Sequence, residues 1–345
     1  MTWLRAIGIE VPIVQAPMAG VQGSALAAAV ANAGGLGSLP CALLAPDGVR
    51  LELERLAAET TRPINVNFFC HQPPAVDRAR EDAWRARLAP YYRELDVDPA
   101  TIQSNAGRMP FDDGAAALIE AFKPAVVSFH FGLPVSKLLA RVRATGARIV
   151  SSATTVDEAR WLEAHGADAI VAQGFEAGGH RGMFLGDDLT TQVGTLALLP
   201  QIVKAVNVPV IAAGGIADAA GVRAALTLGA SAVQIGTAFL LCPESTTSAV
   251  HSAALETDTA RHTAVTNVFT GRPARGIVNR LMREVGPLSP DAPAFPLATS
   301  AVTPLRAAAE RQGSADFSPL WAGQNVSGCT RDRAAVLTRR LAGVA

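Results

Sequence analysis

The stretch that decides the fold reads VPVIAAGGIADAAGVRAALTLGASAVQIGTAF and covers residues 208–239. It opens with an apolar run, passes through two glycines into a segment of helical period that Asp218 can cap, and ends in a second apolar run after Gly229. Short Val- and Ile-rich runs that alternate with helical segments are typical of parallel strands covered by helices. This stretch therefore predicts a β/α/β unit.

The same alternation continues along most of the chain. Eight apolar runs alternate with helical patterns over about 240 residues, which favours an α/β fold of the (β/α)8 TIM barrel type over an open Rossmann sheet of about six strands. The predicted strands are Val11–Ala16, Leu36–Leu39, Ile64–Phe68, Ala125–Phe129, Arg148–Ser152, Ala169–Ala172, Val208–Ala213 and Ala232–Ile235.

Three segments depart from this rhythm. We expect a cofactor-binding barrel domain over residues 1–239, in which residues 71–124 form a long polar insertion between the third and fourth strands. Residues 240–304 lose the alternation and become Pro-rich, so we predict a smaller, mainly helical cap on the substrate side. Residues 305–345 are predicted to form a C-terminal helix and a tail that returns to the barrel.

The composition excludes several function classes. The chain has 345 residues, of which 49% are hydrophobic, so it can bury a core and is not disordered. Thirty basic and thirty acidic residues give a net charge of zero, which leaves no basic field to attract nucleic acid or an anionic membrane. No apolar run approaches the roughly 18–20 residues of a spanning helix. We therefore expect small-molecule partners.

The four cysteines are far apart and form no C-x-x-C pair, which indicates neither a disulfide framework nor a zinc ribbon. A reducing, cytoplasmic location fits this pattern best. The sequence leaves the oligomeric state open, a homodimer included.

The residues that are missing from the predicted strand ends are informative, because barrel enzymes carry their chemistry there. The three lysines all lie elsewhere, which excludes a Schiff-base aldolase. No H-x-H pair follows the first strand and no carboxylates end successive strands, so we predict no metal site. An organic cofactor must therefore supply the reactivity.

Two glycine-containing loops follow the seventh and eighth strands, where barrels commonly bind phosphate. Gly214 and Gly215 stand in the first loop, and Gly236 and Thr237 in the second, so their N–H groups are open to a phosphate. The alternative is that these glycines only permit tight packing. FMN fits best, because it needs one phosphate site and no G-x-G-x-x-G follows a first strand for a dinucleotide.

Polar side chains at other strand ends complete the predicted site. Asn67 and Gln173 are neutral amides that can bind the mixed donor and acceptor edge of a flavin, although amides are also buried for structural reasons. His180 follows two glycines and can act as a base or bind an oxyanion, with Arg181 beside it for an anionic substrate group. A loop histidine without a role is the alternative. His130 fits substrate binding and structural packing equally well.

Eight motifs in order resemble the nitronate monooxygenases, formerly called 2-nitropropane dioxygenases, which are FMN-dependent barrel enzymes. Each motif alone is weak, since many phosphate-binding barrels share the glycine turns. The motifs are QAPMAG at 15–20, NAGGLGSL at 32–39, NVNFF at 65–69, SFHFGLP at 128–134, GFEAGGHRG at 174–182, AAGGI at 212–216, QIGTAFL at 234–240 and PLWAGQ at 319–324.

The resemblance implies roles for single residues. His180 corresponds to the family's active-site histidine. It would orient a nitronate anion and remove the α-proton of a neutral nitroalkane. The implied reaction oxidises an alkyl nitronate, such as propionate 3-nitronate, with O2 through a flavin semiquinone to a carbonyl compound and nitrite-type products. The residues implied to hold or line FMN are Met18, Asn67, Gln173, Gly178, Gly215, Gln234, Ile235, Gly236, Thr237 and the tail that ends at Gln324.

Two other functions stay open at this stage. A flavin-dependent enoyl-acyl carrier protein reductase resembles the same barrel, carries a similar EAGGH loop and uses NAD(P)H. The arginines of residues 78–87 could supply its basic patch for an acidic carrier protein, although a solvated helix face explains them equally well. A catalytically silent barrel that binds a phosphate ligand is the other alternative. Residues 71–124 match no site role in the resemblance.

Overall fold

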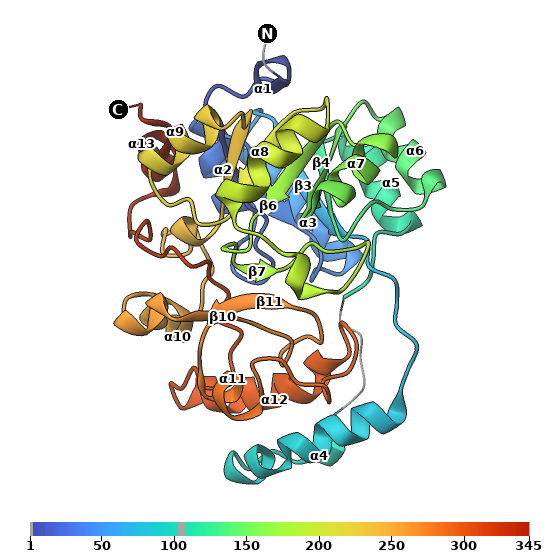
Figure 1. Cartoon of the computed structure of the whole chain (residues 1–345), viewed down its shortest axis with the longest axis vertical. Coiled ribbons are helices and arrows are strands. Elements are labelled where there is room, and N and C mark those ends of the chain that lie inside the picture. The colour runs from blue at the N-terminus through green and yellow to red at the C-terminus, as the bar shows by residue number, and fades with distance from the viewer. Residues whose placement is uncertain (1–2, 103–107, 345) are drawn as a thin grey trace.

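The computed structural model describes residues 3–102 and 108–344, and in that part of the chain it shows the predicted barrel with a smaller cap (Figure 1). Eight parallel strands form one sheet in the order β1-β9-β8-β6-β5-β4-β3-β2. The sheet closes into a barrel between the two strands at the ends of this order, β1 and β2. Val14 of β1 forms a β-bridge with Leu36, which precedes β2, and Gln15 N donates to Leu36 O at 2.9 Å. The TIM-barrel prediction is confirmed.

All eight predicted strands are present, and their ends differ from the prediction by a few residues at most. They are buried on both faces, which explains why they appear in the sequence as unbroken apolar runs. The strands are β1 (Ile13–Gln15), β2 (Gly37–Pro40), β3 (Ile64–Phe69), β4 (Val126–His130), β5 (Arg148–Ala153), β6 (Ala169–Gln173), β8 (Val210–Ala213) and β9 (Ala232–Ile235).

Eight helices cover the outside of the barrel, and two of them begin at the caps that the sequence predicts. Thr155 Oγ1 accepts from Glu158 N at 3.2 Å, and Asp218 Oδ1 accepts from Gly221 N at 2.7 Å. The helices are α2 (Ser24–Asn32), α3 (Pro46–Glu59), α5 (Asp113–Phe122), α6 (Ser136–Ala144), α7 (Val156–Ala164), α8 (Thr195–Ala205), α9 (Ala219–Thr227) and α13 (Ala334–Ala342). A short helix, α1 (Trp3–Ala6), precedes them.

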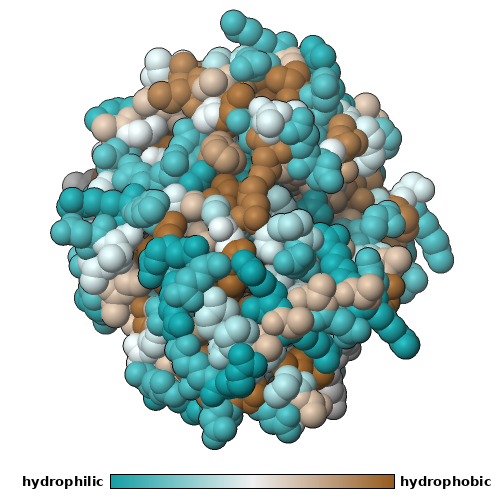
Figure 2. Space-filling view, turned by 60° about the horizontal axis from the view of Figure 1, so that its bottom comes forward, coloured by the Kyte–Doolittle hydropathy of each residue, from teal (hydrophilic) through white to brown (hydrophobic). Residues whose placement is uncertain are grey.

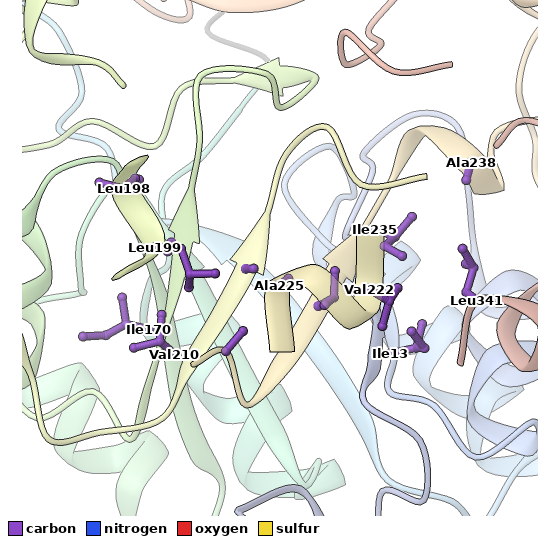
Figure 3. Close-up of a cluster of buried hydrophobic side chains, with 14 of the residues drawn as sticks. Ile13, Ile170, Leu198, Leu199, Val210, Val222, Ala225, Ile235, Ala238 and Leu341 are labelled. Atoms are coloured by element: carbon purple, nitrogen blue, oxygen red, sulfur yellow. The ribbon is translucent and has the colours of Figure 1, made fainter. Parts of the chain in front are cut away.

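The largest buried apolar cluster joins the strands to this helical layer. Figure 3 shows part of it, with Ile170 and Val210 from the strands and Leu198 and Leu199 from α8. Leu341 of α13 belongs to the same cluster and is 1% exposed. The predicted C-terminal tail is therefore the eighth helix of the barrel, and residues 240–333 are inserted between the last strand and that helix.

The insertion after β3 differs from the predicted range, because α5 at its end is an ordinary barrel helix. The preceding part, with α4 (Arg78–Glu94) and the short helix η1 (Pro99–Thr101), leaves the barrel and packs beside α12 (Ala298–Arg311) of the cap (Figure 1). Trp84 and Leu88 of α4 are fully buried in a cluster with cap side chains, and Trp84 Nε1 donates to Ala298 O. The cap is thus built from two distant segments of the chain.

The cap contains more strand structure than predicted. Besides α12 it has helices α10 (Ala249–Leu255) and α11 (Arg280–Val285), strands β10 (Thr263–Thr266) and β11 (Ala274–Ile277), and the short helices η3 (Thr237–Phe239) and η4 (Asp258–Arg261) at its start. A two-residue strand, β7 (Gly179–His180), comes from the loop after β6 and pairs antiparallel with β11. The short helix η2 (Leu189–Thr191) follows in the same loop.

With the cap side turned forward, the surface is largely hydrophilic, with hydrophobic residues gathered near the middle of that face (Figure 2). Among the described residues, no helix has both the length and the apolar composition needed to cross a lipid bilayer.

The packing of α4 predicts that Trp84→Ala destabilises the protein, because it removes a fully buried side chain that packs between α4 and the cap. A fully buried Trp→Ala change costs about 3–5 kcal/mol in the free energy of unfolding. Thermal and urea unfolding measure this effect. Asp82→Ala on the exposed face of the same helix is the control, and equal stability of both variants would contradict the docking of α4.

Candidate functional site

A deep cavity opens at the carboxyl ends of the barrel strands, on the side that faces the cap. With its open mouth included, it encloses about 1400 Å³. Residues within or shortly after each of the eight strands line it, together with Trp321, Gly323 and Asn325 of the C-terminal segment. The predicted residues that line it are Met18, Asn67, His130, Gln173, Gly178, His180, Gly214, Gly215, Gln234, Ile235, Gly236 and Thr237.

The loops after β8 and β9 offer backbone donors to this cavity. In the described part of the chain, the N–H groups of Gly215 and Thr237 donate to no protein acceptor. Gly215 has a φ of +71°, which favours glycine, and a Cβ there would lie 3.2 Å from Glu176 Cβ. The C-terminal segment supports this loop, because Asn325 Nδ2 donates to Gly215 O at 3.1 Å. This end of the cavity fits a phosphate group.

The C-terminal segment lies directly on the loop after β6. A Cβ on Gly178 would be 2.6 Å from the carbonyl carbon of Ala322, and a Cβ on Gly323 would be 2.8 Å from Glu176 O. Both positions therefore require glycine for close approach of the two backbones. Gly323 N also donates to Thr237 Oγ1 at 2.9 Å, which ties the segment to the loop after β9.

Gln324, which the resemblance places near FMN, does not line the cavity in the structure. Its side chain is exposed, and only its backbone N–H is used, in a hydrogen bond to Glu176 O at 3.0 Å. Asn325 is the side chain that lines the cavity. The motif that the prediction used ends at Gln324, and the turn of the backbone that separates the two side chains has no signature in the sequence.

Besides Asn325, three amide side chains line the cavity. Asn67 Nδ2 donates to Ser128 Oγ at 2.9 Å, which leaves Asn67 Oδ1 free of protein partners among the described residues. Gln173 accepts from Gly182 N at 2.8 Å and donates to His180 O at 2.9 Å, so it keeps one N–H and one lone pair for a ligand. Gln234 makes no side-chain hydrogen bond in the described part of the chain. This set suits a flat heterocycle with donors and acceptors on one edge.

His180 stands between the barrel and the cap. Its Nε2 lies 2.9 Å from Thr270 Oγ1, and Thr270 Oγ1 in turn reaches Arg272 O at 3.4 Å. The Thr270 hydroxyl donates its proton to that carbonyl, and its oxygen therefore accepts from the imidazole. We accordingly assign the proton of the neutral ring to Nε2. Nδ1 then carries the lone pair, and it has no protein partner among the described residues.

Burial determines the charge state of the histidines around the cavity. It lowers the pKa of His180 well below the ordinary value, and the positive charge of Arg108 lowers it further. Burial likewise lowers the pKa of His130 to about 4. Both rings are therefore neutral at pH 7.

His130 supports the site and has no ring nitrogen left for a substrate. Its Nδ1 lies 3.1 Å from Ser152 Oγ, and its Nε2 lies 3.2 Å from His180 O. Of its two sequence interpretations, the structure favours the one in which His130 is a structural residue that positions the backbone of His180.

Arg181 does not lie at the cavity, contrary to the prediction. It is fully buried on the other side of the β7 strand, where its guanidinium donates to Gly174 O at 2.7 Å and to Gln173 O at 2.8 Å. Its remaining donors reach Gln192 Oε1 at 2.9 and 3.1 Å. Because neighbouring residues of a strand point to opposite faces, His180 and Arg181 cannot both face the substrate. Arg181 fixes the shape of the loop.

Sequence reasoning also missed two polar side chains that line the cavity. Arg108 comes from the insertion after β3, and His251 comes from α10 of the cap. His251 is 4% exposed, and its Nε2 has no hydrogen-bond partner among the described residues. Neither residue follows a strand or belongs to a recognisable motif, so no signal in a single sequence identifies them.

Comparisons with known proteins agree with this geometry. Residues 2–336 match the family model described as nitronate monooxygenase. A nitronate monooxygenase of Pseudomonas aeruginosa is 45% identical over 340 residues, which cover 98% of this chain and 97% of that protein.

Two solved structures share the whole architecture. The nitroalkane oxidase of Streptomyces ansochromogenes superposes with a TM-score of 0.89 at 40% identity, over 97% of this chain and 96% of that one. FabK of Thermotoga maritima is less similar, with a TM-score of 0.73 at 28% identity over 99% of this chain and 94% of that one. As its motifs predict, the chain belongs to the nitronate monooxygenase family.

Proposed function

We propose that this protein is an FMN-dependent enzyme that oxidises alkyl nitronates, such as propionate 3-nitronate, with O2 to a carbonyl compound and nitrite-type products. The family supports a flavin-dependent oxidoreductase that acts on nitronates. The observation that carries the proposal is the composition of the cavity wall. It combines the backbone N–H groups of Gly215 and Thr237 with a neutral His180, and its described lining contains no carboxylate.

The described residues fit FMN in particular. Gly215 N and Thr237 N would bind the single phosphate, while Asn67, Gln173 and Gln234 would bind the polar edge of the ring system. A bound flavin supplies the electron transfer between nitronate and oxygen. The absence of carboxylates near the open face suits this role, since a negative charge there would repel an anionic substrate.

His180 provides the proton chemistry. When a neutral nitroalkane binds, Nδ1 accepts the α-proton as the C–H bond breaks, and the electron pair moves onto the nitro group to form the nitronate. The resulting imidazolium and nitronate attract each other. Thr270 keeps the ring oriented through Nε2. A substrate that already is a nitronate needs no proton removal, so His180 then serves only to orient it.

The alternative of a FabK-type enoyl-acyl carrier protein reductase is less supported, because FabK is less similar than the nitroalkane oxidase in both sequence and structure. Helix α4 does carry several exposed arginines, but it is docked against the cap and they belong to its solvent face. A silent phosphate binder is the remaining alternative, and it predicts a protein without flavin. The cytoplasmic location and a homodimer stay predictions.

Anaerobic mixing of the flavin-loaded protein with propionate 3-nitronate, and separately with NADH, tests the proposal. We expect rapid loss of the oxidised-flavin absorbance with the nitronate and no comparable change with NADH. Bleaching by NADH alone, without nitronate turnover, would establish the reductase instead. A colourless protein that takes up no flavin would support the silent binder.

The positive φ of Gly215 predicts that a larger residue at this position specifically weakens FMN binding. Gly215→Val places a branched side chain in the phosphate loop at a positive φ, so the flavin content should fall and the Kd for FMN should rise by at least about tenfold. Gly313→Val is the matched control, because Gly313 also has a positive φ, of +74°, with nothing within 4 Å of its Cβ position. Equal loss of FMN from both variants would show that backbone strain, and not the phosphate loop, is responsible.

The environment of His180 predicts an unusual pH profile. Because the pKa of His180 lies well below 6.5, the free enzyme keeps an unprotonated base, and kcat/KM for a neutral nitroalkane should stay flat from about pH 8 to about pH 6. His180→Asn should lower that kcat/KM by about 100-fold or more with unchanged flavin content. Steady-state kinetics, corrected for ionisation of the nitroalkane, measure both effects. An inflection near pH 6.5 would refute the assigned charge state.

A further inference from the structure

We propose that Arg108 binds the negative charge of the substrate and thereby makes the enzyme select the nitronate anion over the neutral nitroalkane. This inference rests on the proposed function and assigns it a specificity-determining residue. Arg108 belongs to the part of the insertion after β3 that returns from the cap to the barrel.

The position of Arg108 brings it to the same place as His180. Both residues line the cavity, and both contact the ring of Phe295, which the cap supplies. The guanidinium carbon of Arg108 lies 5.7 Å from the centre of that ring, and the imidazole of His180 lies 5.3 Å from it. A substrate beside His180 is therefore within the field of the Arg108 cation.

The charge of Arg108 has no counterpart in the protein. Its hydrogen bond in the described structure runs from Nη1 to the neutral Thr299 Oγ1 at 2.9 Å, and no described acidic residue forms an ion pair with it. A guanidinium has five N–H donors, so several of them have no acceptor among the described residues. An unpaired cation at a partly buried wall is unfavourable, and a bound anion offsets that cost.

The other arginines of this region are already engaged. Arg272 stacks on Phe131, with its guanidinium carbon 4.0 Å from the ring centre, and donates to Met183 O. Arg275 donates to Phe175 O at 3.0 Å. Neither of the two lines the cavity. They contribute to the positive potential but are not placed to contact a substrate.

The histidines do not compete for the anion. His71, next to Arg108, is 5% exposed and stacks edge-on against Phe295 at 4.9 Å. Burial lowers the pKa of His71 to about 4, and that of His251 likewise to about 4. Since His130 and His180 are neutral as well, Arg108 is the one side chain of the described cavity lining that is charged at pH 7. The pKa of Arg108 is lowered to about 10 by burial, which leaves the guanidinium charged.

The guanidinium of Arg108 and a nitronate anion are chemically complementary. A nitronate carries its charge on two oxygens in one plane, as a carboxylate does, and the planar guanidinium fork binds such a pair with two parallel hydrogen bonds. A neutral nitro group offers the same shape without the charge. The difference between the two substrates is therefore where the effect of Arg108 should appear.

The experiment compares kcat/KM for a nitronate with kcat/KM for its parent nitroalkane in the flavin-loaded wild type, Arg108→Met and Arg108→Lys. We expect Arg108→Met to lower kcat/KM for the nitronate about 10- to 100-fold, mainly through KM, and to change the value for the nitroalkane much less. Arg108→Lys should restore part of the difference, because it keeps the charge without the fork. Arg80→Met on the exposed face of α4 is the control for loss of one positive charge.

A second measurement does not depend on turnover. Nitrate, an inert planar anion, should perturb the flavin absorbance of the wild type in a saturable way and should bind Arg108→Met at least about tenfold more weakly. Equal losses for both substrates in Arg108→Met, or unchanged nitrate binding, would overturn the assignment to Arg108. Absence of nitronate turnover in the wild type would instead refute the proposed function.

Discussion

The pairing of two residues of β7 with β11 is the constraint on which the site depends. Gly179 and His180 belong to a barrel loop, yet their backbone is part of the cap sheet. The carbonyl of His180 is also held from the barrel side, where Gln173 Nε2 and His130 Nε2 lie 2.9 and 3.2 Å from its oxygen. Because a catalytic side chain must be placed to within about 0.5 Å, a loop residue needs such support from two directions.

The same arrangement determines the electrostatics. Closing the cap over the barrel mouth buries the histidines of the cavity and keeps them neutral, so the local charge comes from arginine alone. The whole chain has a net charge of zero, and this value says nothing about the cavity. A pocket whose described lining carries one cation and no carboxylate suits a small anion. The charge and the burial come from the two segments, at 71–112 and 240–333, that are inserted into the barrel.

Much of the barrel could be predicted because its strands are buried on both faces and therefore appear in the sequence as unbroken apolar runs. The glycine loops after β8 and β9 could also be predicted to line the cavity, since the loops that follow the strands of this fold lie at its mouth. The cap was harder. Strand β7 has only two residues and no periodicity, α4 packs on a segment some 200 residues away in the chain, and α13 is separated from its strand by the cap.

Single side chains also differ in how far the sequence predicts them. The place of His180 at the cavity could be predicted from its glycines and its position after a strand, whereas Arg181 was misplaced because the short β7 strand, which ends at His180, was not visible in the sequence. Arg108 and His251 lie far from any strand end, and tertiary structure alone brings them to the cavity.

The most direct test of the account is a crystal structure of the protein with FMN bound. We expect the phosphate within hydrogen-bond distance of Gly215 N and Thr237 N, with the open face of the ring system toward His180. Phosphate density at any other strand end, or a ring system that turns its apolar edge toward Asn67 and Gln173, would contradict it.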